Sequence, residues 1–312
     1  MIFMKTTSKI TPLTVSIGIP AYNEEQMIST VVRSLLRQKE EGFVLEKIYV
    51  TLDGSTDHTE ERVRKIKDSR IVLIKNAKRS GKATRLNELF QKNSSDIFFI
   101  IDADVYINDL HFLSKMVKPF ADKKIGLVSA NNHPIKPRTF FGRIWYAAEN
   151  FWYEVRKNVN GGSNLYNNSG CSIAIRKELA DTISLPRETI ADQQFIYIYS
   201  VMAHWKFFFQ KDAFLYYSPP TTLHDIKIQY ARSLGEDSFF HEHFQNRFDD
   251  EFVIPPHEKF AGAVSALLKD PIFTPMAILM LKVLGIIIRE PHPDTKHGLW
   301  PTTSSTKNKI KL

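Results

Sequence analysis

The segment Ile97–Asp104, which reads Ile-Phe-Phe-Ile-Ile-Asp-Ala-Asp, decides the fold that we expect for this chain. Its first part, Ile97 to Ile101, is apolar without a break and is too short for a core helix. The β-branched and aromatic side chains suit a strand that is buried on both faces. Asp102 and Asp104 then stand at the carboxyl end of this strand, and open α/β sheets bind their ligands at that edge.

The two aspartates stand one residue apart, and their charges repel each other unless a cation lies between them. Carboxylate oxygens are ligands that suit Mg²⁺ or Mn²⁺. An aspartate cluster that ends a strand and caps a turn accounts for the same triplet. Short motifs recur by accident, so the triplet by itself leaves both interpretations open.

Strands and helices alternate around this segment. Helices are expected after Asn23, which is a candidate N-cap, after Thr56 or Asp57, and from Lys82. Each connection between strands is long enough for a helix, which is typical of a parallel doubly wound sheet. We therefore predict an α/β fold with a Rossmann-like, mostly parallel sheet flanked by helices. The other expected strands of the first half are 15–19, 47–52 and 70–75.

The second half is expected to mix shorter strands with aromatic-rich helices. A loop rich in glycine and asparagine is expected at 160–170. The expected strands are 125–130, 172–175, 207–210 and 213–217, and the expected helices are 140–159, 193–202 and 224–234. The predicted domain organisation is a flexible start (1–14), a main domain (15–250, with a nucleotide-binding half to about 130 and an acceptor half from 131), a helical segment (251–290) and a tail (291–312), of which Thr302–Leu312 is expected to be disordered.

Composition narrows the function classes. The chain has 312 residues with a formal net charge of +8, and the basic residues are scattered apart from the tail after Thr306, so nucleic acid is not favoured as a partner. A single cysteine, Cys171, excludes an internal disulfide framework and a cysteine-based zinc site. No secretory signal opens the sequence, which predicts a cytoplasmic protein.

Five motifs together carry a resemblance to a known family. They stand in that family's order and spacing across roughly residues 15–235. The motifs are Pro20-Ala21-Tyr22-Asn23-Glu24, Asp53-Gly54-Ser55-Thr56-Asp57, Gly81-Lys82-Ala83 with Asn87, Asp102-Ala103-Asp104, and Asp192. With these motifs in this order and at these strand ends, the chain resembles the family-2 nucleotide-sugar glycosyltransferases, which have the GT-A fold.

The resemblance implies a UDP- or GDP-sugar donor and a divalent cation, Mg²⁺ or Mn²⁺, that takes up the charge of the departing diphosphate. It makes Asp104 the metal ligand, with Asp102 assisting directly or through ribose and water. Asp53 would accept a hydrogen bond from the edge of the base. Lys82 would approach the phosphates, although a solvated lysine at a helix start fits the same position. The donor-binding loop would contribute Pro20, Ala21, Tyr22 and Glu24.

Asp192 is similar to the family's acceptor-activating base, which takes the acceptor proton during one inverting displacement. A helix N-cap is the alternative role for this residue. Three further residues, Gln229, Arg232 and His224, complete the candidate set. The resemblance suggests Gln229 and Arg232 for diphosphate or acceptor contacts, and His224 either for the metal shell or as a surface histidine.

Three departures from the family pattern stand at Leu52, Ala191 and Ser233, where the family often has an acid, Glu and, in processive synthases, Trp. They put processive synthesis in doubt and leave a catalytically weak relative as an alternative. A nucleotidyltransferase of related fold is another, but it usually needs a Gly-rich, Arg-containing loop where Pro20–Glu24 stands.

The apolar stretch 271–288 is at the short limit for a bilayer crossing and contains Lys282. A crossing, an interfacial helix and a soluble packing helix all stay open. The acceptor expected from the resemblance is a lipid or a glycan, with peripheral contact at the inner face of the plasma membrane as one setting.

Overall fold

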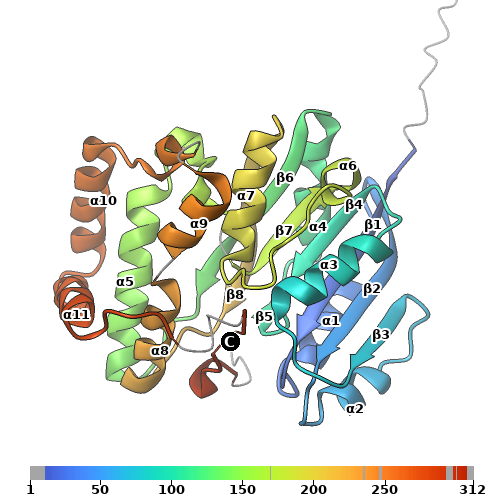
Figure 1. The fold of residues 1–312 in the computed structure, drawn as a ribbon, viewed down its shortest axis with the longest axis horizontal. Coiled ribbons are helices and arrows are strands. Elements are labelled where there is room, and N and C mark those ends of the chain that lie inside the picture. The colour runs from blue at the N-terminus through green and yellow to red at the C-terminus, as the bar shows by residue number, and fades with distance from the viewer. Residues whose placement is uncertain are drawn as a thin grey trace, which may run out of the picture.

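The computed structural model describes residues 11–168, 170–234, 236–245, 248–292, 298–299 and 301–307. The first ten residues of the predicted flexible start therefore lie outside the described residues. One twisted sheet runs through the molecule, with strand order β3-β2-β1-β4-β7-β6-β8-β5 (Figure 1). The strands are β1 (Leu13–Ala21), β2 (Phe43–Asp53), β3 (Ile71–Asn76), β4 (Ile97–Ile101), β5 (Val105–Tyr106), β6 (Ile125–Pro134), β7 (Ser172–Arg176) and β8 (Lys206–Tyr217).

Strand β4 is buried on both faces, as its sequence predicts. Phe99 packs into the core on one face of the sheet, while Phe98 and Ile100 pack into the core on the other. Because side chains alternate along a strand, an unbroken apolar run is needed to fill two cores at once. β1 pairs in parallel with both β2 and β4, so the polar residues after these three strands share one edge of the sheet.

Helices cover both faces of the sheet, which confirms the predicted α/β class. On one face pack α1 (Ile28–Leu36), α2 (Thr59–Arg64) and α4 (Phe112–Val117). On the other pack α3 (Lys82–Lys92), α6 (Lys177–Ala180), α7 (Asp192–Met202) and α9 (Glu236–Phe244). The order of strands and helices from β1 to β4 is the one that the sequence predicts, whereas β7 runs antiparallel to both β4 and β6.

Some local predictions need correction. Asn23 does not cap α1: it has a φ of 54°, and its Oδ1 accepts the Thr56 amide at 2.8 Å. Helix α2 begins at Thr59 after His58, although Asp57 Oδ1 does accept the Thr59 amide at 3.0 Å. The expected strands 207–210 and 213–217 form one strand, β8, with an irregular register opposite Ala130 and Asn131 in β6.

A third group of helices stands beside the sheet. Helix α5 (Phe140–Arg156) lies between the sheet and the pair α10 (Pro256–Lys269) and α11 (Phe273–Ile287), with α8 (Leu223–Ser233) at its side (Figure 1). Gly262 permits close packing of α10, because a Cβ there would meet Val155 Cα of α5 at 2.4 Å.

Among the residues that the structure describes, no helix is both long enough and apolar enough to span a membrane.

Glu154 joins α5 to α10 and provides a test of this packing. Its carboxylate accepts hydrogen bonds from Lys157 at 2.8 Å, Lys269 at 2.6 Å and Ser265 at 2.5 Å. We expect Glu154→Gln to lower the free energy of unfolding by about 1–3 kcal/mol at pH 7, because hydrogen bonds to a charged group are lost. Urea unfolding measures this difference. Asp181→Asn, which breaks only the exposed pair with Lys177, should change stability by less than about 1 kcal/mol.

The same carboxylate gives a pH dependence. Burial alone would raise the pKa of Glu154, but the hydrogen bonds from Lys157, Lys269 and Ser265 hold this pKa at about 2, below the usual 4.5. The stabilisation is therefore present above about pH 4.5 and is lost as the pH falls toward 2. The gap in stability between wild type and Glu154→Gln should close over this range, and a gap that stays constant from pH 7 to pH 2.5 would contradict the assignment.

Candidate active site

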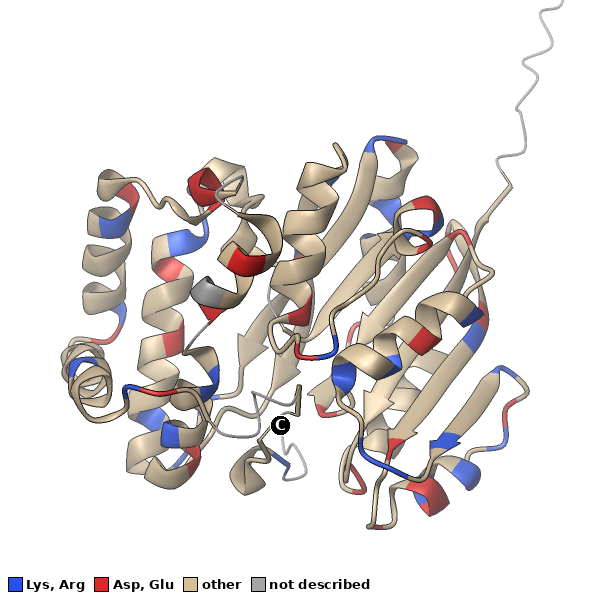
Figure 2. Ribbon diagram, viewed as in Figure 1, with Lys and Arg blue, Asp and Glu red and all other residues tan. Residues whose placement is uncertain are grey.

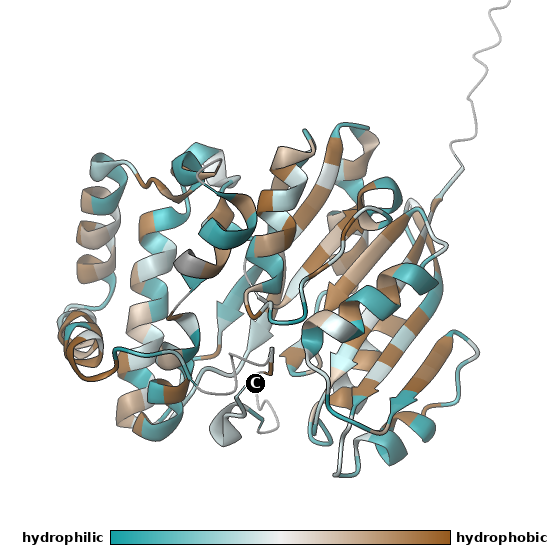
Figure 3. Cartoon of the chain, in the orientation of Figure 1, coloured by the Kyte–Doolittle hydropathy of each residue, from teal (hydrophilic) through white to brown (hydrophobic). Residues whose placement is uncertain are grey.

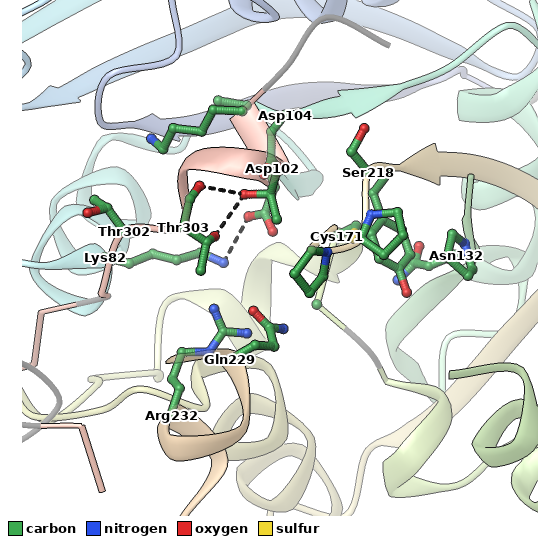
Figure 4. Close-up of a pocket in the computed structure, with 18 of the residues that line it drawn as sticks. Lys82, Asp102, Asp104, Asn132, Cys171, Ser218, Gln229, Arg232, Thr302 and Thr303 are labelled. Atoms are coloured by element: carbon green, nitrogen blue, oxygen red, sulfur yellow. Dashed lines mark hydrogen bonds and ion pairs between the residues drawn. The ribbon is translucent and has the colours of Figure 1, made fainter. Parts of the chain in front are cut away.

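A cavity of about 610 Å³ lies where β1, β2 and β4 end. Helix α8 and the C-terminal segment 301–307 contribute to its wall (Figure 4). Most of the candidate residues named from the sequence line this one cavity, because parallel strands bring their carboxyl ends to a common edge. They are Pro20, Ala21, Tyr22, Glu24, Asp53, Lys82, Asp102, Asp104, Gln229 and Arg232.

Lys82 joins two of the candidate acids. Its Nζ lies 2.8 Å from Asp102 Oδ1 and 3.2 Å from Asp192 Oδ2, and its side chain is 11% exposed. The lysine is therefore a buried cation and is not the solvated helix-start residue that the sequence also allowed. Burial raises the pKa of Asp102 to about 7, although Lys82 acts to lower it. The two carboxylates hold the pKa of Lys82 above its usual range despite its burial.

Glu24 and Asp104 add negative charge to the same part of the cavity. Burial and the charge of Asp104 raise the pKa of Glu24 to about 8. Glu24 Oε2 is buried without a hydrogen-bond partner among the described residues. Burial also raises the pKa of Asp104, while the charge of Lys307 lowers it. An added cation would relieve this crowding of carboxylates, which makes the site chemically suitable for Mg²⁺ or Mn²⁺.

Asp53 organises the loop before α3. Its carboxylate accepts hydrogen bonds from the amides of Ser80 at 2.8 Å and Gly81 at 3.0 Å, and from Arg85 Nε at 2.8 Å. Gly81 has a φ of 92°, a conformation that favours glycine. Asp53 therefore fixes the start of the helix that carries Lys82. The sequence reasoning missed Arg85, although it stands one helical turn after Lys82.

Asp192 is 2% exposed and does not line the cavity. It is the first residue of α7 and follows the N-cap Ala191, so the N-cap role weighed from the sequence does not hold. Asn87 of α3 positions the preceding chain, because its amide side chain exchanges two hydrogen bonds with the backbone of Leu185, at 2.8 and 2.9 Å. The buried carboxylate of Asp192 is therefore linked to the cavity through Lys82, which lines it and lies 3.2 Å away.

Gln229 and Arg232 reach the cavity from α8. Burial lowers the pKa of Arg232, while the charges of Glu236, Asp102, Asp192 and Asp104 act to raise it. His224, at the start of the same helix, is exposed and is not among the lining residues, so the structure does not bring it to the two aspartates. Among the described residues, no group of three His, Cys, Asp or Glu side chains is arranged to hold a metal ion.

The tail corrects another expectation. The segment 301–307, which is predicted to be disordered from Thr302 onward, contributes lining residues to the cavity beside the 20–24 loop. Lys307 Nζ donates to Glu24 Oε1 at 2.7 Å and to the carbonyl oxygens of Asn23, at 3.0 Å, and Tyr22. Thr303 and Thr306 exchange hydrogen bonds within the tail (Figure 4). Local sequence patterns carry no signal for Lys307, because the contact spans more than 280 positions.

Comparison with known proteins bears on this arrangement. The poly-beta-1,6-N-acetyl-D-glucosamine synthase of Staphylococcus aureus is 29% identical over 128 residues, which are 40% of this chain and 30% of that protein. A UDP-Glc:alpha-D-GlcNAc-diphosphoundecaprenol beta-1,3-glucosyltransferase of Escherichia coli is 35% identical over 105 residues, which are 32% of this chain and 41% of that protein. The match therefore spans less than half the length of these relatives.

A solved structure extends the comparison to the fold. A mannosyltransferase from Pyrobaculum calidifontis, solved with GDP-Man and Mn²⁺, aligns with a TM-score of 0.60 over 89% of this chain and 76% of that chain, at 20% identity. That likeness shows a GT-A fold. A family model described as glycosyl transferase family 2 matches residues 16–184, which is more than half of the sequence. The chain therefore belongs to glycosyl transferase family 2.

Proposed function

We propose that this glycosyltransferase moves a sugar from a UDP- or GDP-sugar donor to a lipid or glycan acceptor, with inversion at the anomeric carbon. The observation that carries the proposal is the cavity in which Asp102 and Asp104 face Lys82 and Arg232. The negative phosphates of a nucleoside diphosphate need cations. Its base and ribose need a polar surface to lie on. This cavity offers both kinds of group.

The donor would lie along the edge formed by the ends of β1 and β2. Ala21 and Tyr22 would form the floor under the base, with Pro20 and Glu24 completing the loop. Arg79 lies over the Tyr22 ring with its guanidinium carbon 4.1 Å from the ring centre, which adds a rigid wall to this floor. Lys307 now contacts the loop that the donor would use, so donor binding requires this side chain to shift.

A divalent cation fits this proposal. Mg²⁺ is usually held through one or two carboxylates together with substrate phosphates, so a complete protein cage is not needed. Asp104 would hold the cation, with Asp102 assisting, and the crowded charges of Asp104 and Glu24 favour such an occupant. The bound ion would supply charge stabilisation for the departing diphosphate.

The chain's own residues would then carry out the displacement. The acceptor hydroxyl oxygen bonds to the anomeric carbon as the bond to the diphosphate oxygen breaks, and the hydroxyl proton passes to Asp192. Lys82 Nζ lies 3.2 Å from Asp192 Oδ2, so a positive charge stands beside the carboxylate that would accept the proton. Asp192 is 2% exposed, so the proposed proton transfer requires Lys82 to move toward the donor phosphates and uncover it.

Product analysis tests this proposal directly. Incubation with UDP- and GDP-sugars, Mn²⁺ and candidate acceptors should release a nucleoside diphosphate, detected by a coupled phosphatase assay. A protein that releases pyrophosphate from a nucleoside triphosphate and a sugar phosphate would be a nucleotidyltransferase, and the proposal would fail. A thermal-shift panel of UDP and GDP, with and without Mn²⁺, identifies the base, because ligands of the folded state raise the unfolding midpoint.

Peripheral contact with a membrane is part of the proposal. Helices α10 and α11 expose apolar side chains on the outer side of the molecule, and α11 is mainly apolar with Lys282 as its single charge (Figures 2 and 3). Leu279 and Ile286 are 64% and 66% exposed and lie seven residues apart, on one face of the helix. Lys282 and Arg289 are exposed nearby and suit anionic headgroups.

Replacing Leu279 and Ile286 by glutamine should reduce binding to anionic liposomes at least about tenfold, because each side chain contributes on the order of 1.5 kcal/mol when removed from water. Both side chains are exposed, so the unfolding midpoint of the variant should equal that of the wild type. Liposome sedimentation provides the measurement. Leu110→Gln, at an apolar side chain that is 42% exposed elsewhere, serves as the control. If the wild-type protein does not sediment with liposomes, the proposed membrane contact is wrong.

A further inference from the structure

One part of the cavity is not used by the donor-binding and base roles described above. This α5 chamber is the part of the cavity formed by α5 with strand β6 and the loop before β7. It has a mixed aromatic and charged lining. The residues that define it are His133, Glu149, Trp152, Tyr153, Arg156 and Tyr166.

Arg156 is the cation of the α5 chamber. Its Nη1 donates to the Tyr166 carbonyl, but its Nε is buried without a hydrogen-bond partner among the described residues. Burial lowers the pKa of this guanidinium while the charges of Tyr217 and Glu149 act to raise it, and within the described part of the chain no carboxylate forms an ion pair with it. A buried charge without a paired partner is costly, so the side chain is set up to receive an anion. A guanidinium fits the planar oxygens of phosphate and carboxylate.

The neighbouring groups compensate this charge only in part. Glu149 accepts hydrogen bonds from Trp145 Nε1 at 2.7 Å and Tyr217 Oη at 3.1 Å, and burial raises its pKa to about 7. It is therefore only partly ionised near neutrality. The buried Nε2 of His133 also has no partner among the described residues. Burial and the charge of Arg156 lower the pKa of His133, which leaves a neutral imidazole at neutral pH.

The α5 chamber adjoins the reacting end of the donor site. Cys171 lies between the two parts: its carbonyl accepts the Asp102 amide at 3.0 Å, and burial together with the charges of Asp102 and Glu149 raises the pKa of its thiol. Figure 4 places Cys171 across the cavity from Lys82. Trp152 and Tyr166 stack with ring centres 6.4 Å apart, and Trp152 is 47% exposed at the rim. These rings offer a surface for a sugar or another ring of the acceptor.

We infer that the α5 chamber is the acceptor subsite and that it selects an acceptor carrying an oxyanion, a phosphate or a carboxylate, which Arg156 binds. The inference rests on the proposed transfer reaction and specifies its acceptor class. Arg156 would act in binding, while Asp192 receives the proton. The aromatic rim would hold the adjoining part of the acceptor, which brings its hydroxyl toward the donor.

Calorimetric titration of the full chain with inorganic phosphate tests this inference. UDP or GDP with Mg²⁺ is kept in excess so that the donor site is filled. Arg156→Gln should weaken phosphate binding about 10- to 100-fold, which corresponds to the loss of one or two charge-assisted hydrogen bonds. A parallel titration with glucuronate distinguishes a preference for phosphate from a preference for carboxylate. Lys157→Gln is the matched control, because this adjacent cation pairs with Glu154 and does not line the cavity.

A second variant guards against a folding defect. Glu149→Gln keeps the size of the side chain and one acceptor oxygen for Trp145 Nε1 but removes its negative charge, so phosphate should bind several-fold more tightly at pH 8. A purely structural Arg156 would lower the unfolding midpoint in Arg156→Gln and leave phosphate affinity unchanged in both variants, which would overturn the inference. Wild-type protein that binds no phosphate with the donor site filled would also overturn it.

Different results would contradict the proposed nucleotide-sugar donor and the inferred anionic acceptor. Wild-type protein that binds neither UDP nor GDP would contradict the proposed donor, and the phosphate titration could then be read on the chain without nucleotide. Normal nucleotide binding combined with equal phosphate affinity in wild type and Arg156→Gln would contradict only the anionic acceptor.

Discussion

Asp192→Asn should lower the rate of sugar transfer about 100- to 10,000-fold while leaving donor affinity within a few-fold of wild type. A general base contributes about this much, and asparagine keeps the size of the side chain but cannot accept the proton. The proposed donor contacts come from Asp102, Asp104 and the 20–24 loop, none of which is altered. The loss should therefore appear in turnover and not in binding, as measured by steady-state kinetics and by nucleotide titration.

The structure provides a control and an alternative for this experiment. Glu188 is the nearest acid before Asp192 in the sequence; its side chain is 51% exposed and lies 3.5 Å from His243 Nε2. Glu188→Gln should leave turnover unchanged. If Asp192→Asn keeps near-normal turnover while Glu188→Gln loses it, Glu188 is the base. If Asp192→Asn chiefly raises the KM for the donor, Asp192 serves to position Lys82, to which it is paired at 3.2 Å.

Asp104→Asn should remove the stimulation of nucleoside diphosphate binding by Mn²⁺. Loss of a residue that only supports a metal ligand costs about 10- to 100-fold in metal affinity, and loss of a ligand should cost at least as much. Calorimetric titration of UDP and GDP, with and without Mn²⁺, measures the effect. The variant should stay folded, because the substitution also relieves the repulsion with Glu24 that burial makes strong.

Asp109→Asn is the matched control for the metal assignment. This aspartate lies soon after Asp104 in the sequence, but it pairs with Lys115 at 2.6 Å and does not line the cavity. Nucleotide binding by Asp109→Asn should respond to Mn²⁺ as in the wild type. Equal Mn²⁺ responses in wild type and Asp104→Asn would show that another group holds the cation.

The first half of the fold could be predicted from local sequence because its information is local. The apolar run of β4 is short and unbroken, which indicates a strand that fills two cores, and the structure confirms it. Parallel strands joined by helices bring their carboxyl ends together, so the strand-end motifs indicated one site. The placement of Lys82, Asp102 and Asp104 in a single cavity follows from that rule.

Details that depend on contacts between distant segments could not be predicted in this way. Asparagine often caps helices, but the Asn23 side chain accepts the Thr56 amide instead, and Asn23 has a positive φ. His224 stands near Gln229 in sequence but is exposed on α8, because a helix sends successive side chains to different sides. The spacing of residues along a helix predicts which side chains reach a site only when the buried face of that helix is known.

The sequence by itself determined strands β1 to β4, the helices between them and the edge that holds the acidic motifs, because hydrophobic periodicity and strand-end motifs lie within short segments. Only the tertiary structure decided which charges meet. The pairing of Lys82 with Asp102 and Asp192, the contact of Lys307 with the 20–24 loop and the lack of a partner for Arg156 Nε among the described residues all depend on burial and on distances between remote segments. Electrostatic interactions gain their strength from exclusion of water, and that exclusion exists only once the chain has folded.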